Sequence, residues 1–201
     1  VKPVPVWLDG MIQEATAIHA SHPNYLTKAL SKSLLRDDGE NPFTSEWFRP
    51  VKGRELRESI VMDSSPCIVL ATSGMLNGGP VMEYFKNWAH EERNSLCFVG
   101  YQAEGTLGRR LQKGFGEVPM LINGKTEIVK IGCEMVTIDG FSGHSDRRQL
   151  LDFVDRINPP PKNIICHHGD YQKCNELGLT LRERYNCLTF APSNLETVRL
   201  F

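Results

Sequence analysis

Several features are scarce in this 201-residue chain, and each absence narrows what the protein can be. No apolar run approaches the roughly 18 residues that a membrane-spanning helix needs, so the sequence predicts no membrane protein. The six cysteines form no CxxC pair and the six histidines no HxHxDH-type cluster, so no complete zinc-ligand motif is visible. Gly and Pro are scattered and no heptad pattern persists, which excludes collagen, coiled coil and disorder.

The chain also has no large excess of charge of either sign. The formal net charge is −1, so the whole chain has no general attraction for nucleic acid. When the chain is divided into residues 1–60, 61–100, 101–130 and 131–201, only residues 101–130 are net positive, with five basic against three acidic side chains. A solvated surface is the plainer interpretation of that stretch, and a weak phosphate-binding surface is the alternative.

The cysteines sit mostly in apolar surroundings. Four of them lie inside or beside β-rich apolar segments: Cys67, Cys97, Cys133 and Cys166. A free thiol in such a place behaves as a small hydrophobe. We therefore expect buried, reduced thiols and a cytoplasmic protein, rather than a disulfide or zinc framework.

Short apolar strands alternate with amphipathic helices along the chain. The pattern predicts strands at residues 4–8, 67–72, 96–99, 136–138, 163–166, 187–190 and 195–201. It predicts helices at residues 11–20, 23–35, 54–62, from 80 onward, 106–110, 146–157 and 170–185. This alternation favours an α/β protein with a mostly parallel, covered sheet, and the strand at 67–72 should be buried because it is apolar throughout. The Asn123-Gly124 pair predicts a hairpin, which interrupts the rhythm and suggests a domain change nearby.

Two Gly-rich loops follow predicted strands, at the edge of a parallel sheet where ligands gather. Residues 73–79 hold three glycines before a helix, so their backbone N–H groups could approach an anion. Residues 100–106 end in Gly-Thr and are followed by Arg109 and Arg110, a pattern suited to phosphate. Taken alone, a tight turn explains the first loop, and a helix cap with surface arginines explains the second.

Two further loops carry histidines at strand–helix junctions. His144 lies between small polar residues, where a general acid or metal ligand would be exposed. His167 and His168 follow a predicted strand, whose alternation points the two rings to opposite sides. Two histidines are fewer than the three protein ligands of a hydrolytic zinc site, so the spacing indicates half a site, and structural histidines are the alternative.

Four of these segments, in order, resemble one known family. They read ATSGMLNGG at residues 71–79, GYQAEGTLGR at 100–109, FSGHSD at 141–146 and HGD at 168–170. This set is similar to the β-CASP branch of metallo-β-lactamase-fold nucleases, specifically to archaeal homologues of the 3′-end processing endonuclease of the cleavage and polyadenylation specificity factor. The ending APSNLETVRL at residues 191–200 fits the archaeal form.

The resemblance implies a domain organisation. Residues 1–126 would be most of a Rossmann-like β-CASP domain, and residues 127–201 the C-terminal portion of a metallo-β-lactamase domain. The family's HxHxDH motif would precede Val1, which is no initiator residue, so we expect the chain to be a piece of something longer.

The resemblance also implies roles for individual residues. Two Zn²⁺ ions would act in the full-length protein, with His168 a ligand to one of them. His144 would contact the scissile phosphate and stabilise or protonate the leaving oxygen, while Asp146 and Asp170 would orient neighbours or cap helices. The implied RNA-contacting residues are Ser73, Gly74, Gly105, Thr106 and Arg109.

The function expected on these grounds is zinc-dependent RNA endonuclease action, with 5′→3′ exonuclease action as an addition, in RNA 3′-end processing or transcription termination. A non-catalytic RNA-binding or scaffolding subunit is one alternative, and a small-molecule metallohydrolase is another. The partners expected are RNA and a second copy of the chain. Homodimerisation would use the C-terminal segment, because residues 195–201 alternate apolar and polar residues to the last position.

Overall fold

The chain divides into two compact units, residues 1–142 and residues 143–201. The structure is a computed structural model that describes residues 4–35, 41, 43, 46–122, 124–141 and 143–200. Within those ranges, no helix combines the length and the apolar character needed to cross a bilayer.

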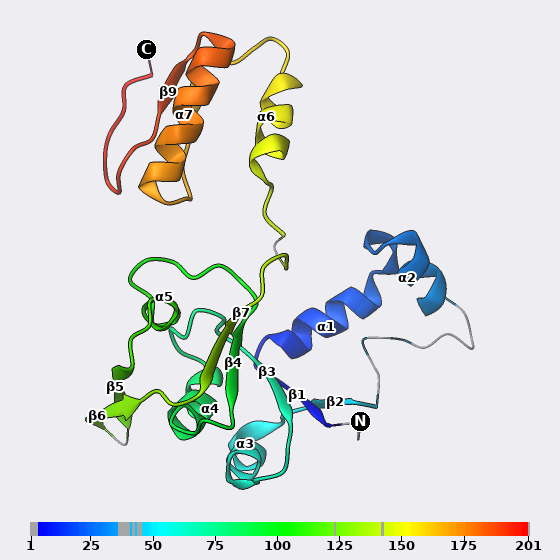
Figure 1. The fold of residues 1–201 in the computed structure, drawn as a ribbon. Coiled ribbons are helices and arrows are strands. Elements are labelled where there is room, and N and C mark those ends of the chain that lie inside the picture. The colour runs from blue at the N-terminus through cyan, green and yellow to red at the C-terminus, as the bar shows by residue number, and fades with distance from the viewer. Residues whose placement is uncertain are drawn as a thin grey trace. The chain divides into compact units, whose positions relative to one another are not determined.

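The helices and strands are short and follow the predicted alternation (Figure 1). The strands are β1 (Val6–Asp9), β2 (Phe48–Pro50), β3 (Ile68–Ala71), β4 (Ser95–Phe98), β5 (Glu117–Ile122), β6 (Lys125–Lys130), β7 (Glu134–Thr137), β8 (Asn163–Ile165) and β9 (Leu188–Phe190). The helices are α1 (Ile12–Ser21), the 3₁₀ turn η1 (Pro23–Tyr25), α2 (Lys28–Leu34), α3 (Gly53–Met62), α4 (Val81–Trp88), α5 (Leu107–Gln112), α6 (Arg147–Asp155) and α7 (Tyr171–Tyr185).

Most strand pairs are parallel, which confirms the predicted α/β class. In the first unit a three-stranded parallel sheet has the order β2-β1-β3, and β4 pairs in parallel with β7. The hairpin predicted around Asn123-Gly124 is the antiparallel pair β5–β6. Asn123 lies outside the described residues, and Gly124 has a φ of +76°, which a side chain would strain. The predicted domain change near this hairpin stays a prediction.

Helix α4 holds the first unit together because it contributes to two hydrophobic clusters. Tyr84 packs in a cluster with Val51 and Ile60, next to the β2-β1-β3 sheet. The adjacent Phe85 packs in the other cluster, which includes Phe98 of β4 and residues of the hairpin. Consecutive helical residues point about 100° apart, so one helix can serve two cores.

Two burial expectations are wrong. Ile68 and Leu70 in β3 are 48% and 39% exposed, because they share the face of the strand that stays open to solvent in the described structure, whereas Val69 and Ala71 on the other face pack in a hydrophobic cluster. Cys97 in β4 is exposed, and Cys67 is only half-buried. All six cysteines are free thiols, as expected, and burial raises the pKa of Cys67, Cys133 and Cys166.

Two element predictions also need correction. No strand was predicted at β2, because that stretch has no regular sequence pattern. The strand forms because it pairs in parallel with β1. The helix expected over residues 23–35 is instead the turn η1 followed by α2. Thr27 interrupts it, because its hydroxyl caps α2 by accepting a hydrogen bond from the Leu30 N–H at 3.4 Å.

The second unit is built on a β8–α7–β9 crossover. Strands β8 and β9 pair in parallel, and α7 (orange in Figure 1) covers them. Val154 of α6, Cys166 and Leu181 form its buried core. Asn186 ends α7 in the left-handed conformation, with a φ of +49°, and so turns the chain into β9.

The predicted terminal strand at residues 195–201 is wrong for its described residues. Leu195 has a φ of +65° and is fully exposed, which breaks any strand alternation. The Glu196 N–H donates to the Ser193 carbonyl at 3.1 Å, and the Ser193 N–H donates to the Glu196 carboxylate at 2.7 Å. These two bonds close a turn, so homodimerisation through this segment stays a prediction without its original structural basis.

Candidate functional site

The two Gly-rich loops are bonded into one substructure of the first unit. The Gln102 side-chain amide donates to the Gly74 carbonyl at 2.8 Å and to the Gly100 carbonyl at 3.1 Å. The Gly108 N–H donates to the Met75 carbonyl at 3.2 Å. The loop after β3 and the loop after β4 are therefore held together by one buried side chain and one backbone contact.

Gln102 is a residue that the sequence interpretation missed. Its side chain is 2% exposed, and its Oε1 atom is buried with no hydrogen-bond partner in the described structure. A Cβ at Gly108 would lie 1.8 Å from that oxygen, so only glycine permits this packing. The available signal was a glycine inside a short helix, where it weakens the helix unless a close contact requires it.

We expect Gly108→Ala to weaken the connection that Gln102 makes between the two Gly-rich loops. The added methyl group would displace the buried Gln102 side chain and remove its hydrogen bonds to the Gly74 and Gly100 carbonyls. The expected loss is about 1–2 kcal/mol in the free energy of unfolding, after allowing for the better helix propensity of alanine. Urea unfolding followed by circular dichroism measures it.

Gly100→Ala is the matched control, because a Cβ there meets no atom within 4 Å and the position lies in the loop that leads into α5. Equal unfolding free energies for the two variants would contradict the packing role of Gly108.

The polar side chains of the two loops serve mainly to shape them. The Thr106 hydroxyl caps α5: it accepts from the Arg109 N–H at 3.2 Å and donates to the Ala103 carbonyl at 2.7 Å. The Ser73 hydroxyl accepts from the Asn77 N–H at 3.1 Å. Gly105 has a φ of +85°, a turn conformation that favours glycine. These hydroxyls therefore organise the backbone. The Ser73 and Thr106 N–H groups are also engaged, with the Gly78 and Ala103 carbonyls, so a phosphate would meet the loops mainly through cations.

Arg109 is paired within the chain. Its Nε atom lies 3.0 Å from Glu104 Oε1, and Lys113 Nζ lies 2.8 Å from Glu104 Oε2. These hydrogen bonds, first from Lys113 and then from Arg109, lower the pKa of Glu104. The Glu104 carboxylate thus pairs with both Arg109 and Lys113 next to the two Gly-rich loops, and all three side chains are partly exposed.

His144 and Asp146 lie at the start of the second unit. Asp146 forms a capping box with Gln149: its carboxylate accepts the Gln149 N–H at 2.8 Å, and its own N–H donates to Gln149 Oε1 at 2.9 Å. The cap fixes the backbone two residues after the exposed His144. Ser142 of the same motif lies outside the described residues.

His168 has an unusual backbone. Its φ is +64°, in the left-handed region that non-glycine residues enter at a cost of roughly 1–2 kcal/mol. This conformation also overturns the expectation that His167 and His168 point to opposite sides, since their ring centroids lie 6.3 Å apart. Asp170 occupies the N-cap position of α7, with its carboxylate 3.5 Å from Lys173 Nζ. Strain of this kind is common at functional sites.

The described residues do not fit a zinc centre by themselves. Nowhere in the described ranges do three His, Cys, Asp or Glu side chains come together in a way that could hold a metal ion. A structural or catalytic zinc site needs at least three protein ligands. His168 is therefore at most one ligand of a set.

Comparison with known proteins agrees with the motif pattern. Residues 1–111 match the Beta-Casp domain family, and residues 128–192 match the family described as Zn-dependent metallo-hydrolase RNA specificity domain. The chain is 55% identical over 198 residues to "Transcription termination factor FttA" of Methanosarcina mazei, and 49% identical over 198 residues to the protein of that name from Pyrococcus horikoshii. These alignments cover 98% of this chain but only 31% and 30% of the two relatives. Since the Beta-Casp match covers more than half of the residues, the chain belongs to the β-CASP family.

Proposed function

We propose that this chain is the RNA-contacting part of a metal-dependent ribonuclease that serves transcription termination or RNA 3′-end processing. The observation that carries the proposal is the joint between the two Gly-rich loops, made by Gln102 beside the cations Arg109 and Lys113. Rigid backbone donors next to an arginine suit a phosphodiester chain, which carries one charge per nucleotide. The names of the relatives and the RNA specificity domain match support the same substrate class.

Within this proposal the two loops bind and orient RNA. The segments that contain Ser73, Gly74, Gly105 and Thr106 line the path of the RNA. The Ser73 and Thr106 N–H groups already donate to the Gly78 and Ala103 carbonyls, so the backbone contacts fall to the two glycines. Arg109 exchanges its contact with Glu104 for a phosphate oxygen as the strand binds. The domain assignment that goes with this is a β-CASP domain over residues 1–126 and the C-terminal portion of a metallo-β-lactamase domain over residues 127–201.

The histidines take separate roles in the proposal. His144 contacts the scissile phosphate and holds a proton near the leaving oxygen. His168 supplies one metal ligand, and its left-handed backbone presents the ring from the start of α7. Asp146 and Asp170 keep these two loops in place. The remaining metal ligands would come from residues outside this chain, so no chemical step is assigned to the metal here.

We expect the 201-residue chain alone neither to cleave RNA nor to retain stoichiometric zinc, because a single histidine ligand binds zinc too weakly. Elemental mass spectrometry after dialysis against a weak chelator measures the metal, and a labelled-RNA assay measures cleavage. Robust cleavage by the purified chain would refute the proposal that this chain contacts RNA while most of the metal ligands lie outside it. RNA binding without cleavage, even in the longer protein, would favour the non-catalytic RNA-binding alternative.

A further inference from the structure

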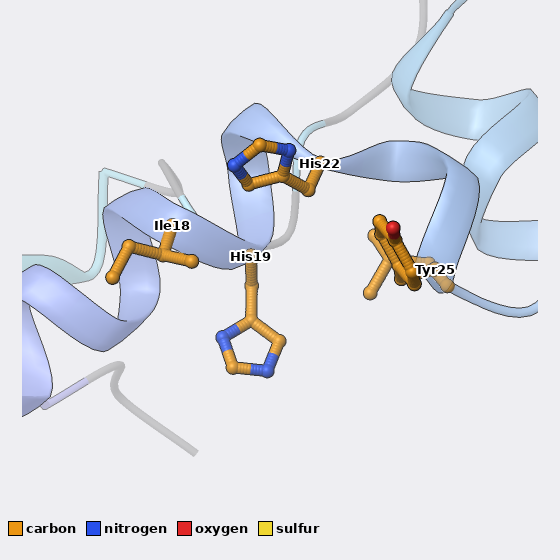
Figure 2. Close-up of a pocket in the computed structure, with 5 residues that line it drawn as sticks. Ile18, His19, His22 and Tyr25 are labelled. Carbon is orange, nitrogen blue, oxygen red and sulfur yellow. The ribbon is translucent and has the colours of Figure 1, made fainter.

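A hollow at the end of α1 lies apart in sequence from the Gly-rich loops. It has a volume of about 420 Å³ and is lined by Ile18, His19, His22, Tyr25 and Leu26. Figure 2 shows the two histidine rings projecting from the end of α1, with the Tyr25 ring on the far side of the space. Small-molecule sites in proteins occupy roughly 300–1,000 Å³, so the hollow is large enough for a nucleobase.

The walls of this hollow are aromatic and open to solvent. Tyr25 is 90% exposed, an unusual position for a large ring, and its centroid lies 6.4 Å from that of His22. The His19 ring is held in place by its Nδ1 atom, which donates to the Ala15 carbonyl at 2.7 Å. His19 also lies near Phe43, with ring centroids 6.0 Å apart. The Tyr25 and His22 rings lie at 76° to each other, so a planar base can stack on the exposed face of Tyr25 while His22 meets its edge.

The segment from the second half of α1 to the end of α2, between Glu14 and Asp37, carries positive charge only. Residues 15–35 contain no Asp or Glu, although 24 of the 201 residues in the chain are acidic. The same segment holds Lys28 and Lys32, four positions apart and so on one face of α2. Neither lysine has an ion-pair partner among the described residues. The charge pattern therefore suits a polyanion.

We propose that this hollow binds an unstacked base of single-stranded RNA, stacked on Tyr25 with His22 at the edge of the base, while Lys28 and Lys32 contact the flanking phosphates. The inference rests on the proposed RNA-binding function and adds a second contact surface, on the α1–η1–α2 segment. Single-stranded RNA is typically held by bases stacked on aromatic rings and by cations along the backbone.

The test measures binding of a fluorescein-labelled U12 oligoribonucleotide to the 201-residue chain by anisotropy. Tyr25→Leu keeps apolar bulk and removes the aromatic face, and we expect the dissociation constant to rise about 5- to 100-fold. Tyr25→Phe keeps the face and should bind like the unchanged chain. Because Tyr25 is exposed, neither change should affect folding, which circular dichroism checks.

The lysines are tested through salt dependence. The double variant Lys28→Gln, Lys32→Gln should reduce the slope of log affinity against log salt by about 1.4, the value for two phosphate contacts on a single strand. Lys52→Gln, an exposed lysine just before α3, is the control and should leave the slope unchanged. A 12-base-pair RNA duplex should not distinguish Tyr25→Leu from the unchanged chain, because its bases are already stacked.

The variant Arg109→Gln distinguishes a failure of this inference from a failure of the proposed function. If Arg109→Gln weakens U12 binding while Tyr25→Leu does not, the hollow is not an RNA site and the proposed function stands. If the unchanged chain does not bind U12 at all, both are wrong. If Tyr25→Leu alters only the mass measured by light scattering, the hollow is a protein interface and the inference is overturned. Photocrosslinks from 4-thiouridine should map to residues 18–26, and crosslinks confined to 101–130 would also overturn it.

Discussion

Replacing Arg57 by alanine is expected to lower the free energy of unfolding by about 3 kcal/mol, because it leaves a buried carboxylate unpaired. Asp9, at the end of β1, is 1% exposed. Arg57 of α3 donates to both of its carboxylate oxygens, through Nε at 2.6 Å and Nη2 at 2.8 Å. Tyr84 of α4 donates its hydroxyl to Asp9 Oδ2 at 2.8 Å. The loss lies at the low end of the range for buried pairs because the Tyr84 bond remains.

The same helix provides the control. Arg54 also forms an ion pair, with Glu58, but its side chain is 86% exposed, so Arg54→Ala should change stability little. Arg57→Lys keeps the charge without the two-pronged contact and should recover only part of the loss. If Arg54→Ala and Arg57→Ala unfold at the same urea concentration, the buried pair does not stabilise the fold.

Acid should weaken this network with a definite sign. Burial alone raises the pKa of Asp9, but the hydrogen bonds from Arg57 and Tyr84 outweigh it and lower that pKa overall. The stabilisation is therefore complete above the unfolded pKa of about 3.9 and is lost as pH falls through the lower folded value. The difference in unfolding free energy between the unchanged chain and Arg57→Ala should shrink as the pH falls below about 5. Urea unfolding at each pH measures it. A difference that grows toward low pH would contradict this sign.

In the longer protein that contains this chain, His144→Ala should reduce RNA cleavage by about 10²–10⁴-fold while metal content stays near normal. His144 is proposed to hold a proton at the leaving oxygen, so its loss slows turnover and leaves the metal ligands intact. His168→Ala should lower activity and bound metal together, because it removes a ligand. Cleavage rates with labelled RNA and elemental analysis of the same preparations separate the two effects.

His167→Ala is the matched control for His168→Ala. The two residues are neighbours and their rings lie 6.3 Å apart, but His168 alone has the left-handed backbone and directly precedes Gly169. We expect His167→Ala to retain metal and most of the activity. Equal metal content in all three variants would show that the roles of His144 and His168 are wrongly assigned.

Local features of the chain were readable from the sequence alone. The amphipathic pattern predicted α3 and α7, and Asn123-Gly124 predicted the β5–β6 hairpin. Asp146 was expected to orient a neighbour or cap a helix, and the structure shows its capping box at the start of α6. Each of these depends on residues within a few positions of one another, so periodicity and turn chemistry are sufficient to predict them. The four ordered motifs were sufficient to predict the β-CASP family.

Contacts between distant residues were decided only by the tertiary structure. Asp9 meets Arg57 and Tyr84 across 48 and 75 positions, and Gln102 meets Gly74 across 28. Strand β2 forms because it pairs with β1, and Ile68 is exposed because only the opposite face of β3 is packed. A pattern of apolar residues shows which side chains prefer burial, but which of them find partners depends on how the elements pack. That packing is a property of the whole unit, so no local stretch of sequence contains it.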